Sequence, residues 1–224
     1  MKKEHKIFDG MKYIINYPSN FEEGKTYPVI VFLHGAGSRG ENISLLEGNP
    51  YFLITDNFND FPFISIAPLC HTNTWFDIFE TLKNLVCHIM KFDFVDKKRI
   101  YLMGASMGGY ATWQLAMSMP DCFAAAVPIC GGGMYWNAER LKNVPIWAFH
   151  GEKDNVVLPE ESQKMVDSVN QKGGCAKLTI YPENGHNAWI DTYSNPSVYS
   201  WLLSHLNCNT GEITDIYDDS KTLG

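Results

Sequence analysis

Continuous apolar runs rich in β-branched side chains recur along the chain, separated by more polar stretches. Runs of this kind, which lack alternation, are typical of strands buried on both faces of a parallel sheet. A segment near the start, residues 12–17, alternates instead and ends at Pro18, which predicts an edge strand. The predicted buried strands are residues 28–33, 63–67, 100–103, 124–129 and 146–149, with a sixth candidate at 177–181.

Segments with apolar residues at helical spacing lie between these runs. Residues 74–92 carry a stripe of apolar side chains that recurs every three to four positions, as expected for one face of a helix. Further helices are predicted at 108–119, 159–172 and 195–206. Alternation of strand and helix predicts an α/β fold with a mostly parallel central sheet and helices on both faces.

The chain has 224 residues, a length at which one domain is the natural expectation. We expect a single domain over residues 1–208 and a polar, acidic C-terminal tail over 209–224. Only residues 131–143 separate two of the predicted strands, so no cap domain is expected above the sheet.

The formal net charge of −7 argues against a nucleic-acid partner. No apolar run reaches the roughly 18 residues of a membrane-spanning helix, and no signal-peptide core follows Met1. The six cysteines are far apart and show no metal-ligand spacing, which favours reduced core residues and no bound metal. A cytoplasmic location is therefore expected, or a secreted one if a leader has been removed.

The most informative motif is Gly104-Ala105-Ser106-Met107-Gly108, which directly follows a predicted strand and precedes a predicted helix. A Gly-x-Ser-x-Gly sequence in this context is a nucleophile elbow, a strained turn that exposes the serine hydroxyl above the sheet. The flanking glycines are needed where strand and helix backbones come close. Ser106 is therefore the candidate nucleophile.

Partners for a serine nucleophile should follow in the order acid, then histidine, each after a later strand. Asp154 follows the strand at 146–149, and His186 follows the candidate strand at 177–181. The carboxyl ends of parallel strands meet at one edge of a sheet, so we expect Ser106, Asp154 and His186 to lie together.

Other residues of the right type remain open. Glu152 is an alternative acid, and His34, His71 and His150 are alternative bases. His34 and His150 each follow a predicted buried strand and precede a glycine, a position that favours a structural hydrogen-bonding role.

The loop after the strand at 28–33, His34-Gly35-Ala36-Gly37, supplies the remaining part of such a site. Its glycines allow a backbone N–H to approach a ligand closely. We predict that the N–H groups of Ala36 and Met107 form an oxyanion hole.

These motifs resemble the α/β-hydrolase superfamily, and within it the small cap-less serine esterases related to polyhydroxybutyrate depolymerases, feruloyl esterases, carboxylesterases, phospholipases and dienelactone hydrolases. The resemblance rests on residues 34–37, 104–109, 151–154 and 185–189 in this order, and it extends over most of the chain. Dienelactone hydrolases proper are similar but use a cysteine nucleophile, whereas position 106 is serine. The resemblance thus implies ordinary ester cleavage through a Ser-His-Asp triad and an acyl-enzyme, without a cofactor.

The expected substrates are small-molecule or oligosaccharide esters with short acyl, acetyl or feruloyl groups. Trp75 and Trp136 follow strands at the expected catalytic edge and are candidate substrate contacts, and Arg39 is a candidate local positive charge. A peptidase similar to prolyl oligopeptidases, or a non-catalytic binding protein on the same fold, remains the alternative. The oligomeric state is not indicated by the sequence.

Overall fold

A computed structural model describes residues 2–208, so the predicted tail at 209–224 lies outside the described residues. Within residues 2–208, eight strands form one sheet in the order β1-β2-β4-β3-β5-β6-β7-β8. Their bounds are β1 (Lys3–Phe8), β2 (Met11–Asn16), β3 (Tyr27–Leu33), β4 (Ile64–Pro68), β5 (Val95–Ala105), β6 (Ala125–Ile129), β7 (Ile146–Gly151) and β8 (Ala176–Tyr181). β2 is antiparallel to both β1 and β4, and the pairs from β4 to β8 are all parallel.

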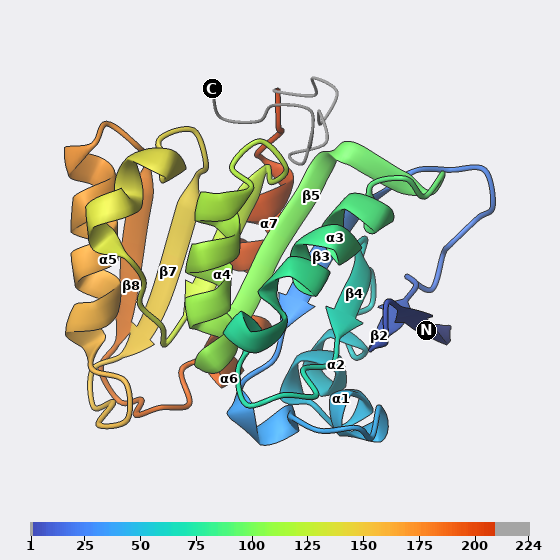
Figure 1. Ribbon diagram of the computed structural model, residues 1–224, viewed down its shortest axis with the longest axis horizontal. Helices are drawn as coiled ribbons and strands as arrows, with labels where there is room; N and C mark the ends of the chain where they lie inside the picture. Colours follow the sequence, from blue (N-terminus) through green and yellow to red (C-terminus); the bar gives the residue numbers. More distant parts are fainter. Residues whose placement is uncertain (1, 209–224) are drawn as a thin grey trace, which may run out of the picture.

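Helices connect the strands and cover both faces of the sheet. The α-helices are α1 (Ser44–Glu47), α2 (Pro50–Thr55), α3 (Phe79–Ile89), α4 (Met107–Ser118), α5 (Pro159–Gln171), α6 (Trp189–Ser194) and α7 (Pro196–Leu203). The described part of the chain also has the 3₁₀ helices η1 (Ala36–Ser38), η2 (Trp75–Ile78) and η3 (Tyr135–Leu141). The strands of the parallel part point to one edge, at the bottom of Figure 1, where the arrowheads of β3, β4 and β7 can be seen. The predicted α/β fold with helices on both faces is confirmed.

The core consists of two apolar layers, one on each face of the sheet. Helices α3, α4 and α5 pack on one face, with Leu85, Trp113 and Met165 among the buried residues. Helices α2, α6 and α7 pack on the other, where Phe52 and Leu202 are buried. Figure 1 shows α3, α4 and α5 in front of the sheet and α7 behind it.

The structure differs from the sequence-based expectation in several elements. β1 was not predicted, because its sequence KEHKIF is polar and it lies at the sheet edge with half of its residues exposed. The single helix expected over 74–92 is instead η2 followed by α3, since Asp77 and Thr74 form a capping box that starts a tight turn. After β6 the described chain forms only η3 before β7, in agreement with the expected absence of a cap domain.

None of the six cysteines forms a disulfide within the described part of the chain. No helix among residues 2–208 has the length and apolar character needed to cross a membrane.

The start of α4 lies directly against the end of β3. A methyl group at Gly108 would collide with the carbonyl oxygen of Leu33 and would lie 2.8 Å from that of His34. Backbone carbonyls inside a sheet cannot move to make room, so only glycine allows this approach.

The substitution Gly108→Ala is expected to lower the free energy of unfolding by about 3 kcal/mol. At Gly48 the nearest atom to an added methyl group lies 3.9 Å away, so Gly48→Ala is the matched control and should change stability little. Urea unfolding of both variants measures the difference. Equal stability of the two variants would contradict the close contact.

His34 joins the loops that follow β3 and β4. Its Nδ1 donates to the Gly35 carbonyl at 2.7 Å, and its Nε2 accepts from the Cys70 N–H at 3.0 Å. Both ring nitrogens of the neutral imidazole are therefore used, which agrees with the structural role expected from the sequence. Burial lowers the pKa of His34 to about 4, because protonation would place a charge in the core and remove the acceptor for Cys70.

A lowered histidine pKa makes stability depend on pH. Between pH 6.5 and about 4 the unfolded chain protonates His34 while the folded chain does not, so the free energy of unfolding should fall as the pH falls. The contribution of this residue is about 3 kcal/mol across that window. Urea unfolding of the wild type and His34→Gln at several pH values should show a shallower slope for the variant. Parallel profiles would show that His34 is not the group responsible.

Candidate active site

Ser106 lies between the end of β5 and the first residue of α4, in a backbone conformation that is rare for a non-glycine residue. Its φ is 57° and its ψ is −119°. Its N–H donates to the Ile129 carbonyl at 2.9 Å, and its carbonyl accepts from the Tyr110 N–H at 3.0 Å. A strained backbone of this kind costs roughly 1–3 kcal/mol and persists only where neighbouring structure enforces it. The elbow predicted from the sequence is present.

Three side chains predicted from the sequence are joined by hydrogen bonds at the carboxyl edge of the sheet. Ser106 Oγ lies 2.8 Å from Nε2 of His186, in the loop after β8. His186 Nδ1 lies 2.7 Å from Oδ2 of Asp154, in the loop after β7. With its proton on Nδ1, the imidazole donates to the carboxylate and its Nε2 accepts from the serine hydroxyl.

Asp154 is buried and held by its own loop. Its Oδ1 accepts the backbone N–H groups of Val156 at 2.9 Å and Val157 at 3.0 Å. Burial raises the pKa of Asp154, but the hydrogen bonds from His186 and from the two backbone N–H groups outweigh it, so the pKa lies below its ordinary value. The carboxylate is thus ionised at neutral pH and faces His186.

A second histidine lies behind Asp154. The Nε2 of His150 is 2.8 Å from the Val157 carbonyl and 3.3 Å from Asp154 Oδ2, and its Nδ1 is 2.8 Å from the Ser162 hydroxyl. Burial lowers the pKa of His150, which keeps the ring neutral. His150 therefore supports the loop that carries Asp154, in agreement with the structural role expected from its position after a strand.

Cys130, His150 and Asp154 are the one group of potential metal ligands within residues 2–208. Burial raises the pKa of the Cys130 thiol to about 12, whereas a metal requires the thiolate. Asp154 and His150 are already engaged in the hydrogen bonds described above. The donor set therefore fits a buried hydrogen-bonded network better than a metal centre.

The alternative acid and base residues lie elsewhere. His34 is buried in the contacts described above, and His71 lines a different hollow of the surface. Glu152 makes no hydrogen bond to the His186 ring, whose Nδ1 is occupied by Asp154.

A cavity of about 420 Å³ opens at Ser106 and His186. Its walls combine the loop after β3, the start of α2, the loop after β7 and helix α6. Its apolar side chains are Pro50, Val156, Trp189 and Tyr193, and the Trp189 ring meets the His186 ring edge-on at 5.3 Å. The cavity therefore offers an apolar space next to a hydrogen-bonded serine.

Ala36 also lines this cavity and opens η1. A Cβ added at the preceding residue, Gly35, would lie 3.5 Å from the Cβ of Ser106, so the loop passes beside the elbow. Met107 is the first residue of α4, and N–H groups at a helix start have no acceptor within the helix. Both residues predicted for the oxyanion hole thus flank Ser106.

The two tryptophans predicted to contact substrate lie outside this cavity. Trp75 has no exposed surface, and its Nε1 donates to the His34 carbonyl at 3.0 Å. Trp136 is 68% exposed and packs edge-on against Tyr135, its neighbour in η3. The buried Trp75 is a packing residue, because its side chain is sealed from any ligand.

Sequence reasoning missed Pro50 and Tyr193 as cavity residues. For Pro50 the sequence does contain a signal, because Asn followed by Pro is typical of the start of a helix. In the structure the Asn49 side chain accepts the Tyr51 N–H, and Pro50 occupies the first helical position. Tyr193 lies in the six-residue helix α6, which is too short to show a periodic pattern.

Comparisons with known proteins agree with this geometry. Residues 66–199 match the model of the dienelactone hydrolase family. Feruloyl esterase B from Piromyces equi is 31% identical over 166 residues, which cover 66% of this chain and 30% of that protein. The bifunctional acetylxylan esterase/xylanase XynS20E from Neocallimastix patriciarum is 26% identical over 142 residues, which cover 55% of this chain and 20% of that one.

Among solved structures, a thermostable esterase is similar with a TM-score of 0.76 and 32% identity, over 92% of this chain and 63% of that chain. The chain thus spans less than a third of the two curated relatives and somewhat under two thirds of the esterase. Because the family model covers more than half of the chain, and the fold and elbow agree with it, the protein belongs to the dienelactone hydrolase family.

Proposed function

We propose that the protein hydrolyses carboxylic esters, with Ser106 as nucleophile, His186 as general base and acid, and Asp154 as the residue that orients His186. The observation that carries this proposal is the continuous chain of hydrogen bonds from Ser106 Oγ through His186 to Asp154, at 2.8 and 2.7 Å. Ser106, at one end of this series of hydrogen bonds, lines a cavity with apolar walls, where an acyl group can be bound.

In the proposed reaction, Ser106 Oγ attacks the ester carbonyl carbon while its proton moves to His186 Nε2. Negative charge develops on the carbonyl oxygen, which the N–H groups of Ala36 and Met107 stabilise. The C–O bond to the alcohol breaks, and His186 returns the proton to the departing alcohol. Water, deprotonated by His186, then attacks the acyl-enzyme and releases the carboxylic acid, which restores Ser106.

The electrostatics of the site favour this assignment of roles. Ionised Asp154 stabilises the imidazolium that forms on His186 in each step. The positive end of the α4 dipole lies at Ser106, where the oxyanion forms. The site needs no cofactor for this chemistry.

The substrates we propose are esters with small acyl or aromatic acyl groups, including acyl groups on carbohydrates. The apolar cavity next to Ser106 supports the acyl part, and the feruloyl and acetylxylan esterases among the relatives support the class. Cleavage of peptide amides by the same residues is the alternative, because a serine triad can attack either carbonyl.

The first test is Ser106→Ala. We expect kcat to fall by about 10⁴- to 10⁶-fold, because the residue that forms the covalent intermediate is lost. Intact-mass spectrometry after incubation with a fluorophosphonate should show one adduct on the wild type and none on the variant. Ser200 is exposed on α7, and Ser200→Ala should react like the wild type.

Wild-type turnover of p-nitrophenyl acetate, methyl ferulate and an aminoacyl p-nitroanilide separates the alternatives. Faster turnover of the esters supports the proposal, whereas preferential cleavage of the anilide supports a peptidase. A folded wild type that forms no adduct and hydrolyses none of them would support a non-catalytic role.

A second test is Asp154→Asn, which keeps the size of the side chain. The new amide oxygen can still accept the Val156 and Val157 N–H groups, but its NH₂ would then face His186 Nδ1. This forces the His186 proton onto Nε2, where it can no longer accept the serine proton, so kcat should fall by about 10⁴-fold.

The matched control is Asp167→Asn on the exposed side of α5, whose carboxylate only accepts from Gln163. Steady-state kinetics on p-nitrophenyl acetate should show wild-type kcat for this control. Less than about tenfold loss in Asp154→Asn would argue against Asp154 as the orienting residue.

A further inference from the structure

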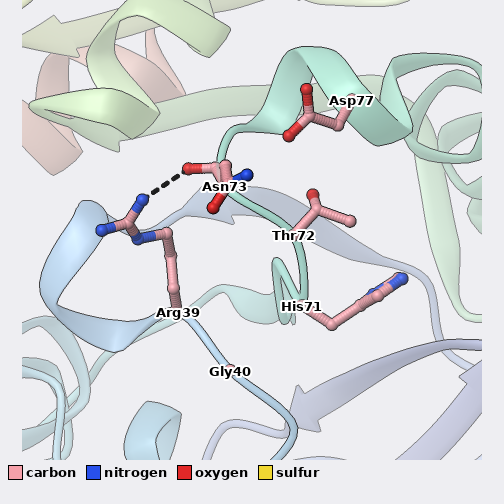
Figure 2. Close-up of a pocket in the computed structure, with 6 residues that line it drawn as sticks. All are labelled: Arg39, Gly40, His71, Thr72, Asn73 and Asp77. Atoms are coloured by element: carbon pink, nitrogen blue, oxygen red, sulfur yellow. Dashed lines mark hydrogen bonds between the residues drawn. The ribbon is translucent and has the colours of Figure 1, made fainter.

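A second hollow, of about 560 Å³, is lined in part by the residues that directly follow η1. Ser38 lines the cavity at Ser106, and the next residue, Arg39, lines the hollow. Consecutive residues at the end of η1, a helix of three residues that rises about 6 Å, thus line the two spaces. The hollow is lined by Arg39, Gly40, His71, Thr72, Asn73 and Asp77, as Figure 2 shows.

The loops that form the hollow are fixed to each other by hydrogen bonds. The Arg39 guanidinium reaches across it and donates from Nη1 to the Asn73 carbonyl at 2.6 Å, the dashed line in Figure 2. Its Nε donates to the Ala36 carbonyl at 3.0 Å, which ties the hollow to η1. The Gly40 N–H also donates to the Cys70 carbonyl at 3.0 Å.

His34 holds the neighbouring segments through two atoms. Its ring Nε2 accepts the Cys70 N–H, and its backbone carbonyl accepts the Trp75 indole N–H. The buried Trp75, which the sequence suggested as a substrate contact, is therefore held to the loop after β3 and not exposed to a ligand. A surface fixed in this way loses little conformational entropy when a ligand binds.

The side chains of the hollow can both donate and accept hydrogen bonds. Among the described residues, no partner engages the His71 imidazole or the Asn73 carboxamide. Asp77 uses Oδ2 to accept the Thr74 N–H, and a carboxylate has further acceptor capacity on its second oxygen. One guanidinium and one carboxylate balance each other, and the chain as a whole is acidic.

This chemistry disfavours two kinds of ligand. An acyl chain would meet mainly polar side chains in the lining, whereas the cavity at Ser106 has Pro50, Trp189 and Tyr193. An anionic group would meet Asp77 as well as Arg39. A neutral molecule with many hydroxyl groups fits best, because each hydroxyl both donates and accepts.

We propose that this hollow binds the sugar hydroxyls of the alcohol half of a carbohydrate ester, while the acyl half occupies the cavity at Ser106. The inference rests on the proposed esterase function and adds the location and chemistry of the alcohol subsite. His71 and Asn73 are the residues that select for sugar, since their side chains are exposed and have unused hydrogen-bonding groups.

The kinetic test compares two acetyl esters that differ in the alcohol: phenyl acetate and an acetylated xylo-oligosaccharide. For the double variant His71→Ala/Asn73→Ala, kcat/KM on the sugar ester should fall about tenfold or more, through KM, since a few hydrogen bonds are lost. Activity on phenyl acetate should stay within about twofold, because neither residue touches Ser106.

Asn20→Ala is the matched control. Asn20 is also an exposed asparagine whose backbone carbonyl accepts from a neighbouring side chain, but it lies between β2 and β3, away from the carboxyl edge. It should leave both activities unchanged. Equal losses on both esters in the double variant, or no loss on either, would overturn the proposed subsite.

A binding measurement separates failure of this inference from failure of the esterase proposal. The unesterified xylo-oligosaccharide is titrated by NMR into Ser106→Ala, with and without His71→Ala/Asn73→Ala. Binding that the double substitution weakens supports the subsite, even if the wild type hydrolyses no ester. The proposed sugar subsite would be rejected if the oligosaccharide did not bind Ser106→Ala and the wild type had equal kcat/KM values for the two acetyl esters.

Discussion

Backbone-to-backbone contact between α4 and the strand ends beneath it is the constraint on which the site depends. Gly108 lies against the last residue of β3, and Gly109 approaches the Ile129 carbonyl at the end of β6. With α4 pressed this closely to the sheet, the chain leaving β5 can turn into the helix only through the positive φ of Ser106. The position of the Ser106 hydroxyl is therefore set by the packing of two glycines, which are not among the hydrogen-bonded side chains of the site.

The sheet then brings the partners of Ser106 to it. β5, β6, β7 and β8 are neighbours in the sheet and run parallel, so their following loops start at one edge. Asp154 and His186 each come from the loop after one of these strands. This is why the elbow and both of its hydrogen-bonded partners could be predicted from the sequence: each follows a predicted strand of a sheet that was expected to be mostly parallel.

What could not be predicted depends on side-chain direction rather than on strand order. Trp75 has the sequence position of a rim residue, but its ring turns inward because the His34 carbonyl offers its indole N–H an acceptor in the core. Pro50 and Tyr193 reach the cavity from short helices on the other face of the sheet. The strand β1 has no apolar face to reveal it, since it only extends an edge.

Val156, in the loop after β7, has two roles, one for its backbone and one for its side chain. The backbone N–H of Val156 holds Asp154, while its side chain, 68% exposed, forms part of the cavity wall. A change of side chain at this position alters the space for an acyl group and leaves the hydrogen bond to the carboxylate in place. Under the proposed function, a single substitution at position 156 can therefore change which acyl groups fit without disturbing the residue that orients His186.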